Sequence, residues 1–184
     1  MHHEFQTDKP LDSFIGVWRR VVTEPRSFFQ DMPVSGGLQQ PLLFLLICIA
    51  ISSLGFLVIG PRSLALWFLV IGVVRSFVGA LVLVLIARNI FAGVGDYEAT
   101  YRAVAYASAP AALLWIPFIR PLVALYTLFL LIIGLERVHG FDAVNSVLTL
   151  LLASLTLFVL GWVLGIYAWL MPILMPLMGR GACA

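Results

Sequence analysis

The segment from Ala143 to Gly179 contains no charged residue. As one helix, at about 1.5 Å per residue, it would be about 55 Å long, whereas the hydrocarbon core of a bilayer is about 30 Å thick. The whole chain has 184 residues, of which 62% are hydrophobic and 11% charged. A soluble domain of this size buries only about 70% of the surface that its chain exposes. We therefore predict an all-α, polytopic integral membrane protein whose principal partner is the lipid bilayer.

The composition also excludes other classes of protein. A soluble enzyme could not bury this much apolar surface. The net charge of +2 is too small to indicate a nucleic-acid partner. Cys48 and Cys183 would lie at different membrane depths, so a disulfide-linked scaffold is not expected. The first forty residues contain charges and no early apolar run, so we expect no cleavable signal peptide.

Apolar runs of about 20 residues predict five transmembrane helices, separated by charged, glycine or proline residues. Asp96 suits the N-cap of the third helix, Gly140 the end of the fourth and Asp142 the N-cap of the fifth. We thus predict a cytoplasmic segment 1–40, a five-helix domain 41–179 and a tail 180–184. The predicted spans are about 41–59, 63–87, 97–119, 121–138 and 143–170.

The basic residues predict the orientation, because they concentrate in cytoplasmic loops. With the N-terminus in the cytosol, the inside segments hold seven basic residues and the outside segments three, Arg75 being left out. We therefore expect a cytoplasmic N-terminus and an outside C-terminus. The inside residues are Lys9, Arg19, Arg20, Arg26, Arg88, Arg102 and Arg137, and the outside ones are Arg62, Arg120 and Arg180.

An amphipathic helix is predicted before the first span. Phe14, Trp18, Val21 and Val22 share one helical face, and Arg19 and Arg20 point away from it. This pattern indicates an interfacial helix on the cytoplasmic leaflet. Such a helix either anchors the segment by packing on the bundle, which we favour, or senses lipid composition or curvature.

Arg75 is the one charge deep inside a predicted span. Intramembrane arginine is costly and usually faces a bundle interior or a wet cavity. Pro110 and Pro117 lack N–H groups and so free the carbonyls of Tyr106 and Leu113. One hypothesis is that Arg75 donates hydrogen bonds to these carbonyls. The alternative is a site for an anion or a lipid head group, or part of a small transporter or channel.

Two predicted cytoplasmic loops hold most of the remaining polar residues. In the first, Glu98 and Arg102 form an i,i+4 pair. In the second, Glu136, His139 and Asp142 have the spacing of a turn rather than of a metal site, so we expect solvated loops with helix caps. No set of residues predicts a catalytic site, a metal or a cofactor. Gly161 and Gly165 form a GxxxG pattern, which we expect to pack inside the bundle, although it also permits a homo-oligomer.

The first loop and its neighbours resemble a known family. The stretch from Phe91 to Arg102, with Gly93, Gly95, Tyr97 and Thr100, followed by Ala105 to Pro110, is similar to the signature of the Yip family, the Ypt/Rab-interacting-protein domains. The similarity extends over Trp18 to Gly165. Supporting matches are Trp18, Pro25, Phe28, Phe29, Met32, Pro41, Tyr126 and Gly134 to His139.

The resemblance implies a five-span protein with a cytosolic N-terminus. Eukaryotic members act in vesicle traffic and bind prenylated small GTPases and one another. Those members carry an acidic, tyrosine- and proline-containing stretch before the first span, and the forty residues before the first predicted span here contain no such stretch, so we do not expect their GTPase binding to carry over. The arginine-rich basic residues and the compact form resemble prokaryotic members of undefined function. The resemblance therefore implies a non-catalytic adaptor or organiser in a prokaryotic inner membrane, with membrane or peripheral protein partners.

Overall fold

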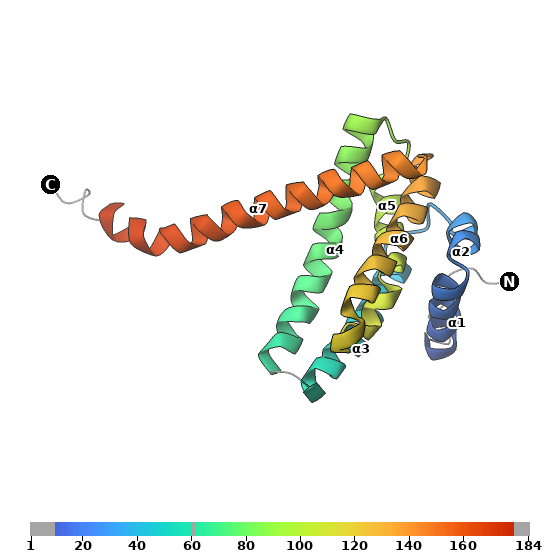
Figure 1. The fold of residues 1–184 in the computed structure, drawn as a ribbon, viewed down its shortest axis with the longest axis horizontal. Coiled ribbons are helices and arrows are strands. Elements are labelled where there is room, and N and C mark those ends of the chain that lie inside the picture. The colour runs from blue at the N-terminus through green and yellow to red at the C-terminus, as the bar shows by residue number, and fades with distance from the viewer. Residues whose placement is uncertain (1–9, 60–61, 179–184) are drawn as a thin grey trace.

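The computed structural model describes residues 10–59 and 62–178, and these form helices with no strand among them (Figure 1). The predictions for Cys183 and for the tail 180–184 lie outside these residues. In chain order the helices are α1 (Pro10–Thr23), α2 (Pro25–Asp31), α3 (Gln39–Ile59), α4 (Arg62–Phe91), α5 (Tyr97–Ala107), the 3-10 helices η1 (Ala109–Leu113) and η2 (Pro117–Ile119), α6 (Arg120–His139) and α7 (Ala143–Met178).

Four helical segments are long and apolar enough to cross a membrane. They correspond to the first, second, fourth and fifth predicted spans. Each is nearly free of charge within an 18-residue window, which is what the hydrocarbon core demands. The segments are Gln39–Val58, Phe68–Phe91, Pro117–His139 and Ala143–Gly165.

The predicted continuous third helix over 97–119 is wrong. Helix α5 has 11 residues, and the chain then changes to 3-10 turns. Pro110 has no N–H to continue an α-helix, and the following donors bond three residues back: Ala111 N to Ser108 O at 2.8 Å and Leu114 N to Ala111 O at 3.1 Å. The segment nevertheless runs the length of the bundle, because it ends at Arg120, whose guanidinium lies over the Phe56 ring of α3.

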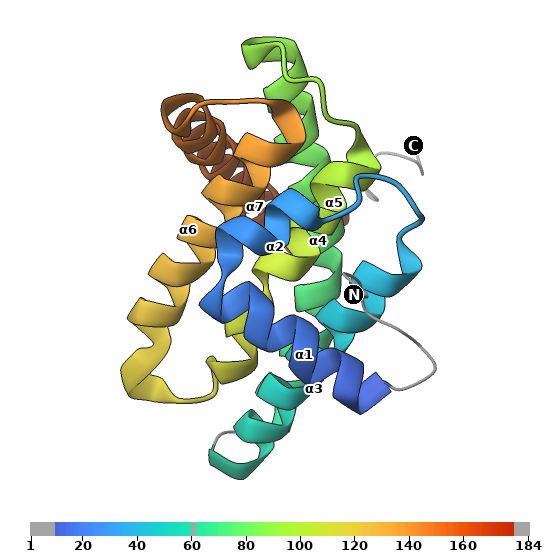
Figure 2. The same cartoon turned by 90° about the vertical axis from the view of Figure 1, so that its right-hand side faces the viewer.

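Helices α3 and α4 pack against each other, α6 runs in the same general direction and is joined to them through α5 and η1, and α7 lies across α4 and α6 before projecting beyond them (Figure 1). Helices α1 and α2 cover the opposite flank (Figure 2). We call the end of the bundle where α4 and α6 finish and α5 and α7 begin the loop end. It contains the connections 92–96 and 140–142 and the segment 32–38 that leads into α3.

The largest buried cluster lies between α1–α2 and helices α3, α5 and α6. Its centre is Tyr106, whose ring packs 5.2 Å from the centroids of both Phe28 and Phe44. Phe14 joins from α1 at 5.3 Å from Phe44. The apolar face of α1 therefore contacts protein, and Trp18 Nε1 donates to the Ala109 carbonyl at 2.9 Å. This is the anchoring arrangement, in which the face of Phe14 and Trp18 does not lie on the leaflet.

Candidate functional site

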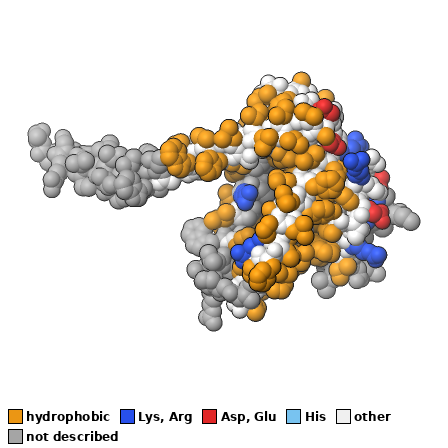
Figure 3. All heavy atoms as spheres, viewed as in Figure 1, with side chains coloured by type: hydrophobic (Ala, Val, Ile, Leu, Met, Phe, Trp, Pro, Cys, Tyr) orange, Lys and Arg blue, Asp and Glu red, His pale blue; other side chains and the backbone are white. Residues whose placement is uncertain are grey.

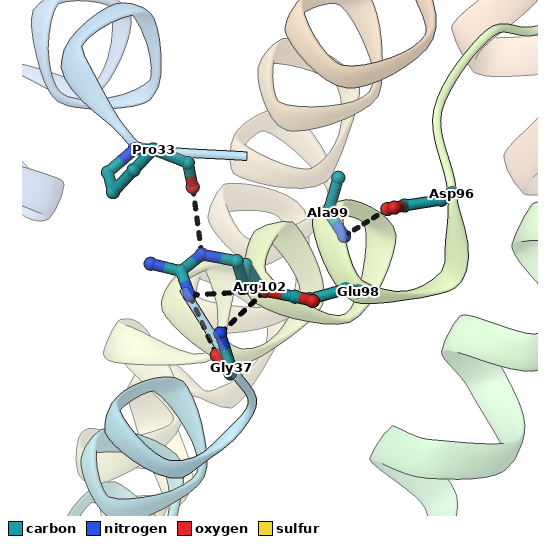
Figure 4. Close-up of polar contacts among 6 residues, drawn as sticks. All are labelled: Pro33, Gly37, Asp96, Glu98, Ala99 and Arg102. Atoms are coloured by element: carbon teal, nitrogen blue, oxygen red, sulfur yellow. Dashed lines mark hydrogen bonds and ion pairs between the residues drawn. The ribbon is translucent and has the colours of Figure 1, made fainter. Parts of the chain in front are cut away.

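Arg102 is the most deeply buried charge at the loop end. Asp96 caps α5 by accepting from Ala99 N at 2.8 Å, which fixes where the helix starts and sets Glu98 and Arg102 one turn apart on one face. The Arg102 side chain is fully buried. Its Nε donates to the Pro33 carbonyl at 2.8 Å and a terminal nitrogen donates to the Gly37 carbonyl at 2.7 Å (Figure 4).

Glu98 completes this arrangement. Its carboxylate accepts from Gly37 N at 2.6 Å and lies 3.9 Å from the Arg102 guanidinium, which confirms the predicted pair (Figure 4). Gly37 has φ of +89°, a left-handed conformation that glycine adopts readily. The pair therefore fixes the segment before α3 against α5. The sequence predicted the pair, but not its burial or its partners at Pro33 and Gly37.

Thr100 and His139 link the two loops. Thr100 Oγ1 lies 3.0 Å from His139 Nε2 and also donates to the Asp96 carbonyl at 2.7 Å. Because the hydroxyl has one hydrogen and a carbonyl only accepts, Thr100 must accept from a protonated Nε2. His139 is 2% exposed, so the prediction that it lies in a solvated loop is wrong. Glu136, on the preceding turn, is half-buried and accepts from Gly140 N through its backbone carbonyl.

Gly93 and Gly95 are required by close packing. A Cβ at Gly93 would lie 2.6 Å from His139 Nδ1 and 2.8 Å from Phe141 Cζ. A Cβ at Gly95 would lie 2.5 Å from Val138 Cγ1 and 2.9 Å from the Val138 carbonyl oxygen. Neither glycine has a positive φ, so the constraint is space and not backbone conformation. The glycine motif lets the connection 92–96 pack directly on the end of α6.

An apolar tip projects from this packed junction. Val94 is 82% exposed, and Ile90 and Val144 are also exposed. We call these three residues the loop-end tip. Phe91 and Phe141 pack edge to face beneath it at 6.1 Å, and Ala92 has a φ of +53°, which is uncommon for a residue with a side chain.

Arg75 does not make the predicted contact with the proline-containing segment. Its side chain is exposed on α4, and no hydrogen bond joins it to that segment among the described residues. The Leu113 carbonyl accepts from Ile116 N at 3.1 Å. The Ser108 N–H donates to the Ala105 and Tyr106 carbonyls at the end of α5. Tyr106 and Pro110 are buried in the bundle, while Pro117 is exposed at its far end. The structure therefore does not assemble these four residues into one site.

Two predictions about packing and metals can be compared with the described residues. A Cβ at Gly161 or Gly165 would meet nothing within 4 Å, so the expected packing of this GxxxG pattern inside the bundle is wrong. Within residues 10–59 and 62–178, no group of three His, Cys, Asp or Glu side chains is placed to hold a metal ion. At the loop end, the side chains of Glu98, Thr100, Arg102 and His139 contact one another or the backbone.

Tyr126 makes a long-range contact that the sequence did not indicate. Its hydroxyl donates to the Val22 carbonyl at 2.7 Å, so it attaches the end of α1 to α6. In the sequence, Tyr126 stood out only as one of the residues that match the family.

A protein-family model described as the Yip1 domain matches residues 19–165. The match begins in α1, includes the loop end and stops within α7. No curated protein and no solved structure matches the chain.

Proposed function

The chain belongs to the Yip1 domain family, and from that premise we propose that it is a non-catalytic adaptor or organiser that recruits protein partners at its membrane. Its membrane environment follows from the family and from the four apolar spans. The adaptor role is supported by the loop-end tip. There, Ile90, Val94 and Val144 are exposed on a support made rigid by Gly93, Gly95 and His139.

The surroundings of the tip suit a protein partner. Arg88, Asp96 and Asp142 are exposed near its residues in the chain. A partner could therefore make apolar contacts with the tip and ion pairs with these side chains. Specific interfaces combine an apolar centre with a polar rim in this way. The buried side chains behind the tip are occupied in holding α5, α6 and the segment 32–38 together.

Five crossings of the membrane are the arrangement that we propose for the spans. The segment 97–119 joins the loop end to the far end of the bundle, so it would cross together with α3, α4, α6 and α7. Within the part of α7 whose side chains the structure describes, 143–165, the buried residues are Ser146, Thr149 and Ala153, all near its start. For α7 to cross beside the others, it must turn about this contact.

We place the N-terminus and the loop end in the cytosol of a prokaryotic cell, with the C-terminus outside, because the basic residues favour that side. A reporter that is active only outside the cytosol, fused after Ala184, should be active, and one fused after Gly140 should be inactive. Activity at both positions, or a C-terminal reporter found in the cytosol, would contradict the five-crossing arrangement.

The adaptor role is tested by extracting the protein in its native lipid patch with a membrane-active polymer and identifying co-purified proteins by mass spectrometry. A stoichiometric partner is expected with the wild-type chain and should be lost with Val94→Asp. Val34→Asp, at an exposed valine of the segment 32–38, is the matched control and should retain it. Trp18 is unsuitable for this test, because its indole is bound inside the bundle.

The outcomes separate clearly. A partner that is lost only with Val94→Asp supports recruitment by the loop-end tip. A partner that survives Val94→Asp contradicts the tip as its binding surface. If no protein co-purifies at a constant ratio, the adaptor role itself is rejected.

A further inference from the structure

Helix α1 lies beside the middle of the spans. The Tyr126 hydroxyl donates to the Val22 carbonyl at 2.7 Å, so these two residues are at the same height. Along the span Pro117–His139, Tyr126 is about 20 Å from His139 and about 14 Å from Pro117, at about 1.5 Å per residue. The end of α1 is therefore well below the loop end.

Helix α2 rises from there to the loop end. Arg137, in the last turn of α6, donates from Nε to the Gln30 carbonyl at 3.3 Å. Figures 1 and 2 show α1 and α2 one above the other on this flank of the bundle, meeting at a bend, and we call the two helices the α1–α2 ridge. The ridge occupies a depth at which acyl chains would surround an ordinary transmembrane helix.

The outward face of this ridge is largely polar, with Ile15 exposed one turn before Arg19. Charged side chains of both signs gather on the flank where α1 and α2 lie, whereas the face formed by α4, α6 and α7 is mostly hydrophobic and carries a few basic side chains (Figure 3). Arg20 and Asp31 form an ion pair at 2.7 Å that is itself partly exposed. The other exposed polar residues of the ridge are Arg19, Thr23, Glu24, Arg26, Ser27 and Gln30.

The exposed face of α6 has the usual lipid-facing character around the same height. Leu122, Leu125 and Leu128 are exposed there, and Leu125 is adjacent in sequence to Tyr126. At one height, the bundle therefore exposes leucine side chains on α6 and arginine side chains on the α1–α2 flank. Acyl chains can cover only the leucine flank, because charged side chains in hydrocarbon are costly.

We propose that the α1–α2 ridge binds anionic lipid head groups of the leaflet that lies at the loop end. Along this flank that leaflet is locally thinned, so that its head groups reach the depth of the ridge. The described charges of the ridge are Arg19, Arg20, Arg26, Glu24 and Asp31, and because Arg20 is paired with Asp31, two exposed arginines, Arg19 and Arg26, remain against Glu24. Arginine binds phosphate oxygens in bidentate fashion.

The depth of the ridge is tested with a matched pair of spin labels. Thr23→Cys and Leu125→Cys are each made in a chain that carries Cys183→Ser. Cys48 is retained, because it is buried and should not react with the spin label. Both positions are exposed and flank the Val22–Tyr126 hydrogen bond, so they share one height. In vesicles of phosphatidylcholine with phosphatidylglycerol, a water-soluble nickel chelate should relax the label at 23, and oxygen dissolved in the acyl chains should relax the label at 125.

The head-group specificity is tested by mass spectrometry of protein released from the same mixed vesicles. Retained phosphatidylglycerol should fall with the double variant Arg19→Gln/Arg26→Gln and stay unchanged with Arg88→Gln, an exposed arginine away from the ridge. Acyl-chain accessibility at position 23 would overturn the proposal. Water accessibility with unchanged phosphatidylglycerol retention would also overturn it, in favour of a water-filled recess. Strong coupling between labels at position 23 of two chains would instead show that a second copy covers the flank.

Discussion

The Thr100 hydroxyl and the His139 imidazole lie 3.0 Å apart and join the first turn of α5 to the last turn of α6. Both residues are buried, so the imidazole N–H has no access to water as a substitute partner. The two cytoplasmic loops of the predicted topology are therefore one folded unit.

Thr100→Val should lower the free energy of unfolding by about 1–3 kcal/mol, because it leaves a buried N–H without an acceptor. Thr127→Val is the control, since its hydroxyl also bonds back to a carbonyl four residues earlier but makes no second contact. Thermal unfolding in lipid nanodiscs compares the two. Equal melting temperatures would show that the Thr100–His139 contact contributes nothing.

Gly93→Ala and Gly95→Ala should each destabilise the protein by about 1–3 kcal/mol, because the added methyl group has no room beside His139 or Val138. Gly79→Ala, in the interior of α4 with nothing within 4 Å, should instead gain up to about 1 kcal/mol from helix propensity. The comparison uses the same unfolding assay. A neutral Gly93→Ala would contradict close packing as the reason for this glycine.

Arg102→Met should lower the free energy of unfolding by about 2–4 kcal/mol, since it removes two charge-assisted hydrogen bonds to the Pro33 and Gly37 carbonyls and the guanidinium beside Glu98, whose bond from Gly37 N remains. Arg102→Lys should recover only part of this, because an ammonium group cannot reproduce the forked geometry. Arg88→Met, an exposed arginine, is the control. Proteolysis within 33–37 should accelerate with Arg102→Met alone.

Trp18→Phe and Tyr126→Phe should each loosen α1 by removing one hydrogen bond to a backbone carbonyl, at about 1 kcal/mol each. Trypsin cleavage after Arg19 and Arg20 reports the loosening. Both variants should be cut faster than wild type, with the double variant fastest. Unchanged cleavage would mean that apolar packing alone holds α1 in place.

Arg75→Leu should leave the melting temperature unchanged, because the exposed guanidinium contacts none of the carbonyls to which it was first assigned. It should also raise the yield of inserted protein, since an arginine at a helix centre costs about 2.5–3.5 kcal/mol on insertion scales. A fall in melting temperature would instead show that the Arg75 side chain stabilises the bundle.

The sequence was most informative about features that depend on neighbouring residues. Asp96 caps α5, Gly140 ends α6 with a φ of +69°, and Asp142 accepts from Asn145 N at the start of α7, all as predicted. The four apolar spans are likewise visible from local composition. Each of these signals is contained within a few turns of helix.

Long-range contacts were beyond the reach of such patterns. The burial of Arg102 depends on carbonyls at Pro33 and Gly37, and that of His139 on Thr100 and Gly93. The third span was predicted from its apolar content, yet Pro110 and the preceding Ser108 turn changed its hydrogen bonding. The sequence predicted Arg75 inside the bundle because an arginine that faces lipid is costly. The spacing of residues along a helix does not show, however, which side of α4 other helices cover.

The contact between Val22 and Tyr126 also has a consequence for biosynthesis. The two residues are 104 positions apart, so α1 emerges from the ribosome long before its partner exists. At about 5–20 residues per second, the nascent N-terminal segment waits roughly 5 to 20 s for Tyr126. During that interval α3 and α4 enter the translocon, and α1 has its apolar face uncovered. Chaperone capture or transient binding to the bilayer surface would protect it until α6 arrives.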